Sequence, residues 1–275
     1  MTTNQGLMTT ATLRKNNVSI EGNLESNETL IFAHGFGTDQ TAWDEVKQAF
    51  QDDYRLVLYD NVGGGKSDPN AYSPKKYNTI HSYADDLLAI IAALELEDVT
   101  VIAHSVSSMI TLLAAIREPQ HFKKLVFVGA SPRYLNDEQA GYIGGFTQPA
   151  LDNMYEAMTN NYYAWVSGFS SAAMGNPEHP ELGESFARTL REIRPDIALA
   201  VSKVIFESDL REELHKLQKP TLLVQANDDI AVPQEVALYL QQHIEGSKLI
   251  QVNATGHFPH ISAPQEVISS IKSFI

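Results

Sequence analysis

The sequence predicts one α/β domain in which helices flank a mostly parallel sheet and a helical segment is inserted. Apolar segments with strand character alternate with segments whose apolar residues recur at helical spacing, and the connections between them are short. The alternation stops between residues 135 and 206 and resumes at Thr221. A chain of 275 residues with 43% hydrophobic content can bury one large core that carries such an insertion.

Composition excludes several classes of function. The formal net charge of −14 argues against binding of nucleic acid, which needs a basic surface, and disfavours anionic membranes. Because the chain has no cysteine, it has neither disulfides nor thiolate metal ligands. No apolar run approaches the roughly 20 residues that span a bilayer, and the polar start lacks the layout of a secretory signal. We therefore expect a cytoplasmic protein with a disordered leader over residues 1–12 and without metal or cofactor.

The chain first predicts a strand over 17–22 and a second over 28–33, joined as a hairpin by a polar turn. The second strand runs into His34-Gly35-Phe36-Gly37, a glycine-containing loop whose backbone N–H groups are expected to face a cavity. The N–H of Phe36 could then form half of an oxyanion hole. An ordinary turn before a helix is the alternative interpretation.

A short helix over 43–50 and a strand over 54–59 lead to a second glycine-rich loop, which extends from Asp60 to Ser67. This loop ends in Lys-Ser, as phosphate-binding loops do. That motif requires glycine at the position of Asp60, and Pro69 interrupts the segment that should form the following helix. We therefore predict a structural turn here.

A helix over 82–96 precedes the central segment, in which a buried strand over 99–102 is followed by Ser105 and a buried helix over 109–116. This position suits a nucleophile at a sharp strand-to-helix turn. The usual pattern is G-x-S-x-G, because strand and helix pass closely and need small flanking residues. Ala103 and Ser107 replace both glycines here, and both are small. The alternative is a serine that caps the helix.

After a strand over 124–129, residues 135–206 are predicted to form a helical lid, with helices over 149–158, 162–174, 180–190 and 196–206. The lid separates two parts of the core, 13–134 and 207–275. Its many aromatic residues serve mainly in packing, but a lid must also present apolar surface to the cleft that it covers.

The remaining strands each end in residues with catalytic potential. Asp228 and Asp229 follow the strand over 221–225, and His257 follows the strand over 249–252, before a closing helix over 264–275. The order serine, acid, histidine is typical of α/β-hydrolases, and parallel sheets place their sites at the carboxyl ends of strands. His257 would remove the proton of Ser105, and the acid would orient the imidazole.

Several assignments stay open from spacing alone. Either Asp228 or Asp229 could be the acid, although the Ile-Ala-Val-Pro segment that follows favours Asp229. His260 competes weakly with His257, since it lacks the preceding glycine. His104 adjoins the serine, and we expect it either to pack in the core or to line the cleft wall as a substrate-binding residue, and not to act as base. The two aspartates have no histidine at ligand spacing, so we predict no metal site.

The chain resembles the α/β-hydrolase family that contains the bacterial stress regulator RsbQ and the plant karrikin and strigolactone receptors. The resemblance extends over nearly the whole chain after about Leu13. The segments that carry it are His34–Gln40, His104–Ser107, Gly129–Asp137, Gly144–Phe146, Arg194–Ile197, Ser208–Arg211, Asp229–Pro233 and Gly256–His257.

The resemblance implies an α/β-hydrolase fold with a lid of four helices, a triad of Ser105, Asp229 and His257, and an oxyanion hole formed by Phe36 and Val106. It settles the choice between Asp228 and Asp229 for Asp229. Ser107 is common in the family, whereas Ala103 stands where glycine is usual. The residues that match aromatic residues of the family's pocket or lid are Phe146, Trp165, Phe169 and Phe206, with Phe36 at the base.

Two functions are compatible with the resemblance. One is hydrolysis of a small hydrophobic ester or butenolide-type lactone. The other is a ligand receptor whose slow hydrolysis is secondary to recruitment of a signalling partner through the lid. Both need the triad.

Overall fold

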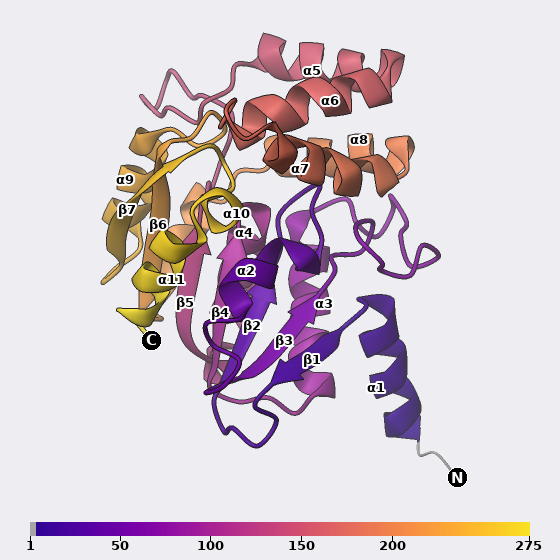
Figure 1. Ribbon diagram of the computed structural model, residues 1–275, viewed down its shortest axis with the longest axis vertical. Coiled ribbons are helices and arrows are strands. Elements are labelled where there is room, and N and C mark those ends of the chain that lie inside the picture. Colours follow the sequence, from indigo (N-terminus) through magenta and orange to yellow (C-terminus); the bar gives the residue numbers. More distant parts are fainter. Residues whose placement is uncertain (1–3) are drawn as a thin grey trace.

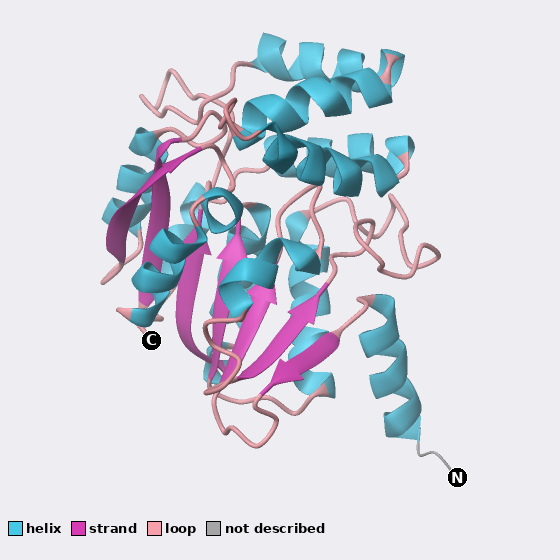
Figure 2. Cartoon of the chain, viewed as in Figure 1, coloured by secondary structure: helices cyan, strands magenta, loops and turns pink. Residues whose placement is uncertain are grey.

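The computed structural model describes residues 4–275, and its centre is a seven-stranded sheet (Figures 1 and 2). The strand order is β1-β3-β2-β4-β5-β6-β7; β1 is antiparallel to β3, and all other pairs are parallel. The strands are β1 (Ser19–Gly22), β2 (Thr29–Ala33), β3 (Arg55–Tyr59), β4 (Val99–His104), β5 (Phe122–Val128), β6 (Thr221–Asp228) and β7 (Lys248–Thr255). The predicted α/β class is confirmed.

The predicted hairpin between the first two strands is wrong. β1 pairs with β3, which lies between β1 and β2 in the sheet. All five residues of β2 are buried, so this strand needs a neighbour on each side, and it finds them in β3 and β4. β1 is only partly buried, and it is therefore suited to the edge of the sheet.

Helices cover both faces of the sheet. Because successive side chains of a strand point to opposite faces, Ile31 and Ala33 of β2 join one core, while Leu30 and Phe32 join the other. The first core packs against α3 (Ile80–Ala93), α4 (Val106–Arg117) and α9 (Gln234–His243). The second packs against η1 (Gln40–Trp43), α2 (Asp44–Lys47) and α11 (Pro264–Lys272). The remaining short elements are η2 (Pro119–His121), η3 (Arg211–Lys216) and α10 (Pro259–Ser262).

Part of the expected disordered leader is helical. α1 extends over Asn4–Lys15 and lies beside α3 (Figure 1), so the prediction for residues 1–12 is wrong from Asn4 onward; residues 1–3 lie outside the described part of the chain. Lys15 at the end of α1 forms an ion pair with Asp86 of α3, whose side chain is almost fully buried. Tyr77 also donates a hydrogen bond of 2.9 Å to Asp86. This contact with the core stabilises the end of the helix, which composition alone did not indicate.

The predicted helices between residues 135 and 206 are present as α5 (Gln148–Asn160), α6 (Tyr162–Met174), α7 (Pro180–Glu192) and α8 (Pro195–Phe206). We call residues 135–206 the helical insertion. It lies over the carboxyl ends of the parallel strands (Figure 1). Side chains of Thr147 and Asn161 cap α5 and α6, and α7 and α8 begin with proline, which suits the first position of a helix.

An ion-pair network ties together the two ends of the helical insertion. Asp209 accepts hydrogen bonds from Arg133 and Arg211, and Arg211 also donates one of 2.8 Å to Asp137. Partial burial opposes the ionisation of Asp209, but the hydrogen bonds from Arg211 and Arg133 are stronger and lower its pKa from 3.8 to about 2. Both ends of the insertion are therefore fixed to one charged cluster.

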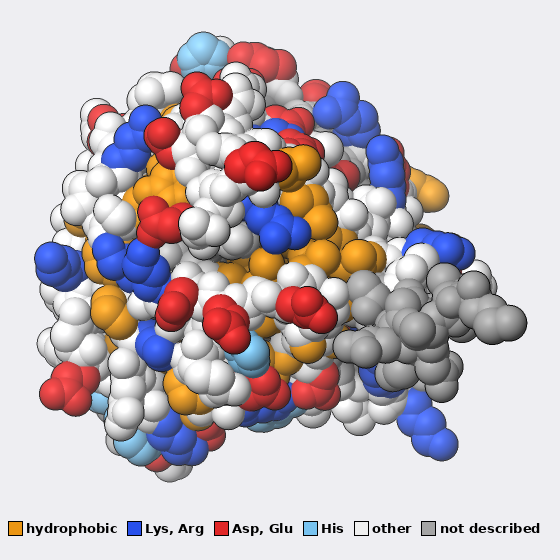
Figure 3. Space-filling model, turned by 90° about the horizontal axis from the view of Figure 1, so that it is seen from below, with side chains coloured by type: hydrophobic (Ala, Val, Ile, Leu, Met, Phe, Trp, Pro, Cys, Tyr) orange, Lys and Arg blue, Asp and Glu red, His pale blue; other side chains and the backbone are white. Residues whose placement is uncertain are grey.

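The surface at the opposite end of the molecule is mixed in charge. In Figure 3, Lys and Arg side chains are scattered among Asp and Glu side chains, with apolar groups between them. Of the helices within residues 4–275, none is long and apolar enough to cross a membrane.

Candidate active site

Ser105 occupies a strained turn between β4 and α4. Its φ of 54° and ψ of −125° lie outside the regions that non-glycine residues normally adopt, and its backbone N–H bonds to the carbonyl of Val128 at 2.9 Å. Such strain is typical of a serine held at a nucleophile elbow. Ala103 is fully buried in the sheet, in register with Ala33 of β2 and Phe127 of β5. A simple helix-capping role is excluded, because Ser105 makes no side-chain cap hydrogen bond.

The structure brings Ser105, His257 and Asp229 into one hydrogen-bonded chain. His257 Nε2 lies 2.9 Å from Ser105 Oγ, and His257 Nδ1 lies 2.9 Å from Asp229 Oδ2. All three residues are buried. This arrangement holds one imidazole nitrogen against the acid and leaves the other facing the serine hydroxyl.

The structure distinguishes between the two adjacent aspartates. The side chain of Asp229 is fully buried, and its Oδ1 accepts the backbone N–H groups of Ala231 and Val232 at 2.9 and 3.1 Å. Gln225 lies against its other oxygen at 3.3 Å. Asp228 is the last residue of β6 and is exposed. Hydrogen bonds of this kind fix the orientation of a carboxylate, so of the two aspartates Asp229 is the one placed to orient His257.

His257 is positioned by a glycine that no larger residue could replace. Gly256 has a φ of 92°, and a Cβ at this position would lie 1.9 Å from the carbonyl oxygen of Met174. Next to it, the backbone N–H of His257 bonds to the carbonyl of Ala173 at 2.8 Å. The end of α6 therefore holds the backbone of the histidine, and the helical insertion contributes directly to the geometry of the site.

The loop after β2 lies against Ser105, as the oxyanion hypothesis requires. A Cβ at Gly35 would approach Ser105 Cβ to 3.1 Å and His104 Nδ1 to 2.4 Å, so only glycine fits. Val106 is the first residue of α4. Its N–H therefore has no acceptor within the helix. Phe36, which follows Gly35, and Val106 both line a cavity beside the serine turn.

The hydroxyl of Ser107 is hydrogen-bonded to the start of the candidate oxyanion loop. It donates a hydrogen bond to the carbonyl oxygen of His34, which also accepts one from Asn61 Nδ2 at 3.1 Å. The same Asn61 amide lies 3.1 Å from Ser107 Oγ. In the G-x-S-x-G pattern this position is glycine, which has no hydroxyl. Here the substituted residue links the start of α4 to the candidate oxyanion loop.

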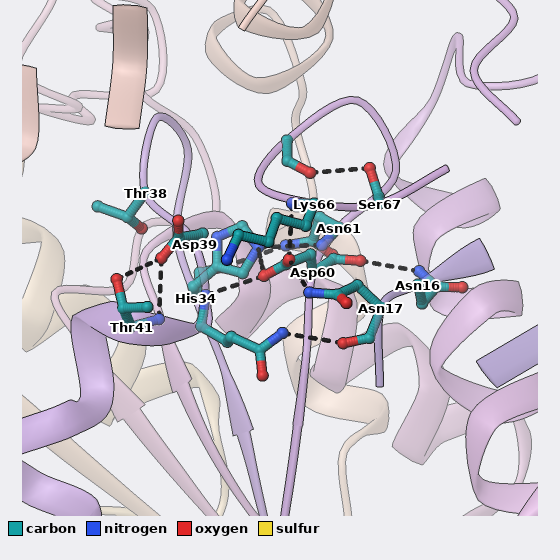
Figure 4. A network of polar contacts seen from close by, with 12 residues as sticks. Asn16, Asn17, His34, Thr38, Asp39, Thr41, Asp60, Asn61, Lys66 and Ser67 are labelled. Atoms are coloured by element: carbon teal, nitrogen blue, oxygen red, sulfur yellow. Dashed lines mark hydrogen bonds and ion pairs between the residues drawn. The ribbon is translucent and has the colours of Figure 1, made fainter. Parts of the chain in front are cut away.

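Asp60 organises the second glycine-rich loop (Figure 4). Its carboxylate accepts hydrogen bonds from the Asn17 side chain and from the backbone N–H groups of Gln40 and Lys66, at 2.8 to 2.9 Å. Ser67 closes the loop with a 2.8 Å bond to the carbonyl of Gly64. Because the N–H of Lys66 already binds Asp60, this segment is the predicted structural turn and not a phosphate cradle.

Two further histidines lie behind the site. His104 is fully buried and bonds through Nε2 to the backbone carbonyl of His257 at 2.8 Å. Of the two expected roles, His104 has the packing role, since its ring packs against Phe258 and His260. The prediction that it binds substrate in the cleft wall is wrong, because the β4 pleat turns its ring inward, away from Ser105. His260 is also fully buried, and burial together with the nearby His257 lowers the pKa of its imidazole to about 3. Its ring packs against Trp43 at 4.4 Å, so it does not compete with His257.

Tyr134 is a site residue that the sequence did not single out. Its hydroxyl lies 3.1 Å from Ser105 Oγ, and burial raises the pKa of this phenol well above its ordinary value. The neutral phenol can therefore donate to the serine oxygen while the serine donates to His257. Tyr134 lies in a loop, where no periodic pattern marks a buried residue.

The four predicted pocket aromatics separate into two clusters. Phe146 and Phe206 contact one another and Tyr134, with ring centroids 5.0 to 6.4 Å apart. Trp165 stacks on Phe169 at 4.9 Å, and rings of Phe186 and Phe258 connect this pair to His257. Phe206 is buried, whereas Phe146, Trp165 and Phe169 are half-buried. The first cluster thus connects the helical insertion to Ser105 through Tyr134, and the second connects it to His257.

A cavity lies on the side of Phe36 and Val106 and has largely aliphatic walls. The side chains that α8 and the residues before it contribute are Ile193, Val201, Val204 and Ile205. The sequence alone did not identify these four as pocket residues, although the spacing of the last three is helical. Separately, among residues 4–275, no group of three His, Asp or Glu side chains is placed to hold a metal ion.

Comparisons with known proteins agree with the fold. Residues 28–264 match the family model for the alpha/beta hydrolase fold. The chain is 44% identical to karrikin insensitive 2 receptor CA of Petunia hybrida, over 92% of each chain. It is 42% identical to a strigolactone esterase of Arabidopsis thaliana, over 88% of this chain and 90% of that one. The solved structure of a hydrolase from Oleispira antarctica superposes with a TM-score of 0.93 at 29% identity, covering 97% of this chain and 96% of the other.

Proposed function

Because the chain belongs to the alpha/beta hydrolase fold family, and within it to the group of the karrikin and strigolactone proteins, we propose that it is a serine hydrolase. The observation that carries this proposal is the continuous hydrogen-bonded chain from Asp229 through His257 to Ser105. We assign Ser105 as nucleophile, His257 as general base and acid, and Asp229 as the residue that orients the imidazole.

The reaction begins when Ser105 Oγ attacks the carbonyl carbon of the substrate and its proton passes to His257 Nε2. Asp229 stabilises the imidazolium that forms. His257 then gives the proton to the leaving alkoxide, and the bond between the acyl carbon and the leaving oxygen breaks. Water attacks the acyl-serine by the same route in reverse, with His257 as base, and releases the carboxylic acid.

The backbone N–H groups of Phe36 and Val106 supply the oxyanion hole in this proposal. They stabilise the negative charge that develops on the carbonyl oxygen, and the loss of one such donor in comparable enzymes costs roughly 3–4 kcal/mol. The contacts of Ser107 and Gly35 support this role, because they fix the loop next to the serine.

We propose a small hydrophobic ester or butenolide-type lactone as substrate and the helical insertion as the lid over it. The aliphatic cavity and the half-buried aromatics support an apolar ligand. The names of the relatives, which refer to karrikin and strigolactone, support the lactone class. The site calls for no metal or cofactor, and we place the reaction in the cytoplasm.

Substitution of the nucleophile tests the proposal. Ser105→Ala should abolish hydrolysis of an activated acyl ester while the protein keeps its thermal unfolding transition. Mass spectrometry of the wild type, after exposure to esters and butenolides, should show an adduct on Ser105 or His257. Near-wild-type turnover in a folded Ser105→Ala protein would refute the assignment.

The alternative is a receptor whose slow hydrolysis serves a signalling partner that binds the lid. Contacts between the insertion and the site favour it, since the carbonyl of Ala173 holds the backbone of His257. A turnover of about 1 per second or faster indicates an enzyme, since typical enzymes work at 1–10³ per second. A far slower turnover indicates a receptor when the ligand also strongly raises the unfolding temperature and changes hydrogen exchange across residues 135–206.

A further inference from the structure

The cavity beside Phe36 is bounded by five separate parts of the chain. Its walls come from the candidate oxyanion loop, the glycine-rich loop, α3, α4 and the helical insertion. The lining includes Phe36 and Val106 but none of the side chains of Ser105, His257 and Asp229. It therefore adjoins the site on the side of the oxyanion hole and away from the histidine.

The walls of this cavity are suited to hydrocarbon. The aliphatic lining side chains are Val62, Ile80, Val106, Ile110, Ile193, Val201, Val204 and Ile205. Both ring nitrogens of His34 are already hydrogen-bonded, to Gly35 and Asn61, and the hydroxyl of Thr38 donates to Gly35. Tyr83 is the exception, with a buried hydroxyl that has no partner within the described chain.

The position of His257 decides which part of a bound ester can lie in this cavity. The leaving oxygen must receive its proton from His257 Nε2, so the alcohol part of an ester lies beside that ring. The acyl substituent then extends in another direction. Because His257 does not line the cavity, while both candidate oxyanion residues do, the cavity lies on the acyl side of the reacting carbonyl.

We propose that this cavity is the acyl-binding subsite and that it selects substrates with a short aliphatic acyl group. The inference rests on the proposed hydrolase function and adds the side of the substrate that determines specificity. Val201, on α8, is suited to test this, because it lines the cavity and is only half-buried. Burial of each additional methylene should raise kcat/KM roughly fourfold until the cavity is full.

A chain-length series tests the subsite. The 4-nitrophenyl esters of acetate, butyrate, hexanoate and octanoate share one leaving group, so differences in kcat/KM report the acyl side alone. In Val201→Phe the ratio of hexanoate to acetate should fall at least tenfold, because the larger ring fills the cavity. In Val201→Ala the preferred chain should become longer. Leu199→Phe is the matched control on the same helix, since Leu199 does not line the cavity, and it should keep the wild-type profile.

The outcomes separate this inference from the proposed function. If Ser105→Ala abolishes turnover of every ester but the Val201 variants keep the wild-type length profile, the subsite is refuted and the hydrolase remains. If the folded Ser105→Ala protein hydrolyses the esters normally, the assignment of Ser105 as nucleophile is refuted, and with it the proposed function on which the subsite rests. If Leu199→Phe changes the profile as much as Val201→Phe does, the selectivity comes from the helix as a whole, and the assignment of the cavity fails.

Discussion

Thr189, on α7 of the helical insertion, donates a 2.7 Å hydrogen bond to the carbonyl oxygen of Gly37 in the candidate oxyanion loop. Phe186 and Leu190 of the same helix pack so closely on Gly37 that a Cβ there would meet the Phe186 ring at 2.8 Å. This hydrogen bond joins residues 152 positions apart in the sequence and attaches the candidate oxyanion loop to the helical insertion. Movement of α7 would break this contact.

Thr189→Val should impair catalysis more than it impairs stability. The variant keeps the shape of the side chain but removes the hydroxyl, which costs about 1 kcal/mol of stability. We expect kcat for an activated ester to fall about tenfold, since the loop loses its hydrogen bond to α7. Thr159→Val is the control, because that hydroxyl bonds only within its own helix. Equal kcat values in the two variants would contradict a role for the contact in catalysis.

Ser107→Ala should weaken the oxyanion hole without removing the nucleophile. Loss of the hydroxyl leaves the Asn61 amide with one partner fewer and removes one of the two side-chain hydrogen bonds to the His34 carbonyl, so the free energy of unfolding should fall by roughly 1–3 kcal/mol. We expect kcat to drop by tenfold or more while KM changes little. Ser108→Ala provides the comparison, since that buried hydroxyl bonds only to Ala103 at the same turn. Similar kcat losses in both variants would indicate a general disturbance of the elbow.

Asp229→Asn should reduce kcat by about 10³ to 10⁴, because an amide cannot stabilise the imidazolium and favours the wrong tautomer of His257. Asp228→Asn should stay within twofold of the wild type, since that side chain is exposed. Steady-state kinetics of both variants with the same ester makes the test. Comparable losses at the two positions would reopen the choice of acid.

Asp209→Asn should destabilise the protein in a manner that depends on pH. The lowered pKa of Asp209 means that its ion pairs contribute stability above its ordinary pKa of 3.8, and that this contribution is lost as pH falls through about 2. Urea unfolding at pH 6 and at pH 3 should show that the difference from wild type falls by roughly half at the lower pH. Asp196→Asn, which removes an exposed pair with Arg194, should have little effect at either pH. A difference of equal size at both pH values would contradict the role of the carboxylate charge.

Local patterns were sufficient for much of the core. Strands and helices of the sheet appear where alternation and periodicity predicted them, because each buried strand or amphipathic helix carries its own apolar pattern. The prediction of the hairpin failed because strand pairing depends on the whole sheet: the fully buried β2 pairs with β3 and β4, and β1 pairs with β3 at the edge. The leader prediction failed from Asn4 onward because α1 is stabilised by contacts with α3, which a polar composition does not reveal.

Some features of the candidate site likewise follow from local sequence, and others from tertiary structure. The sequence by itself determined the order of Ser105, the acid and His257, and it placed each at the end of a strand, since strands and turns are local. Only the tertiary structure gave the two aspartates their different burial and hydrogen bonds, turned His104 away from the cleft, and added Tyr134 and the aliphatic walls of the cavity. These features depend on atoms from distant segments that meet within about 3 to 6 Å, and packing between segments is set by the whole fold.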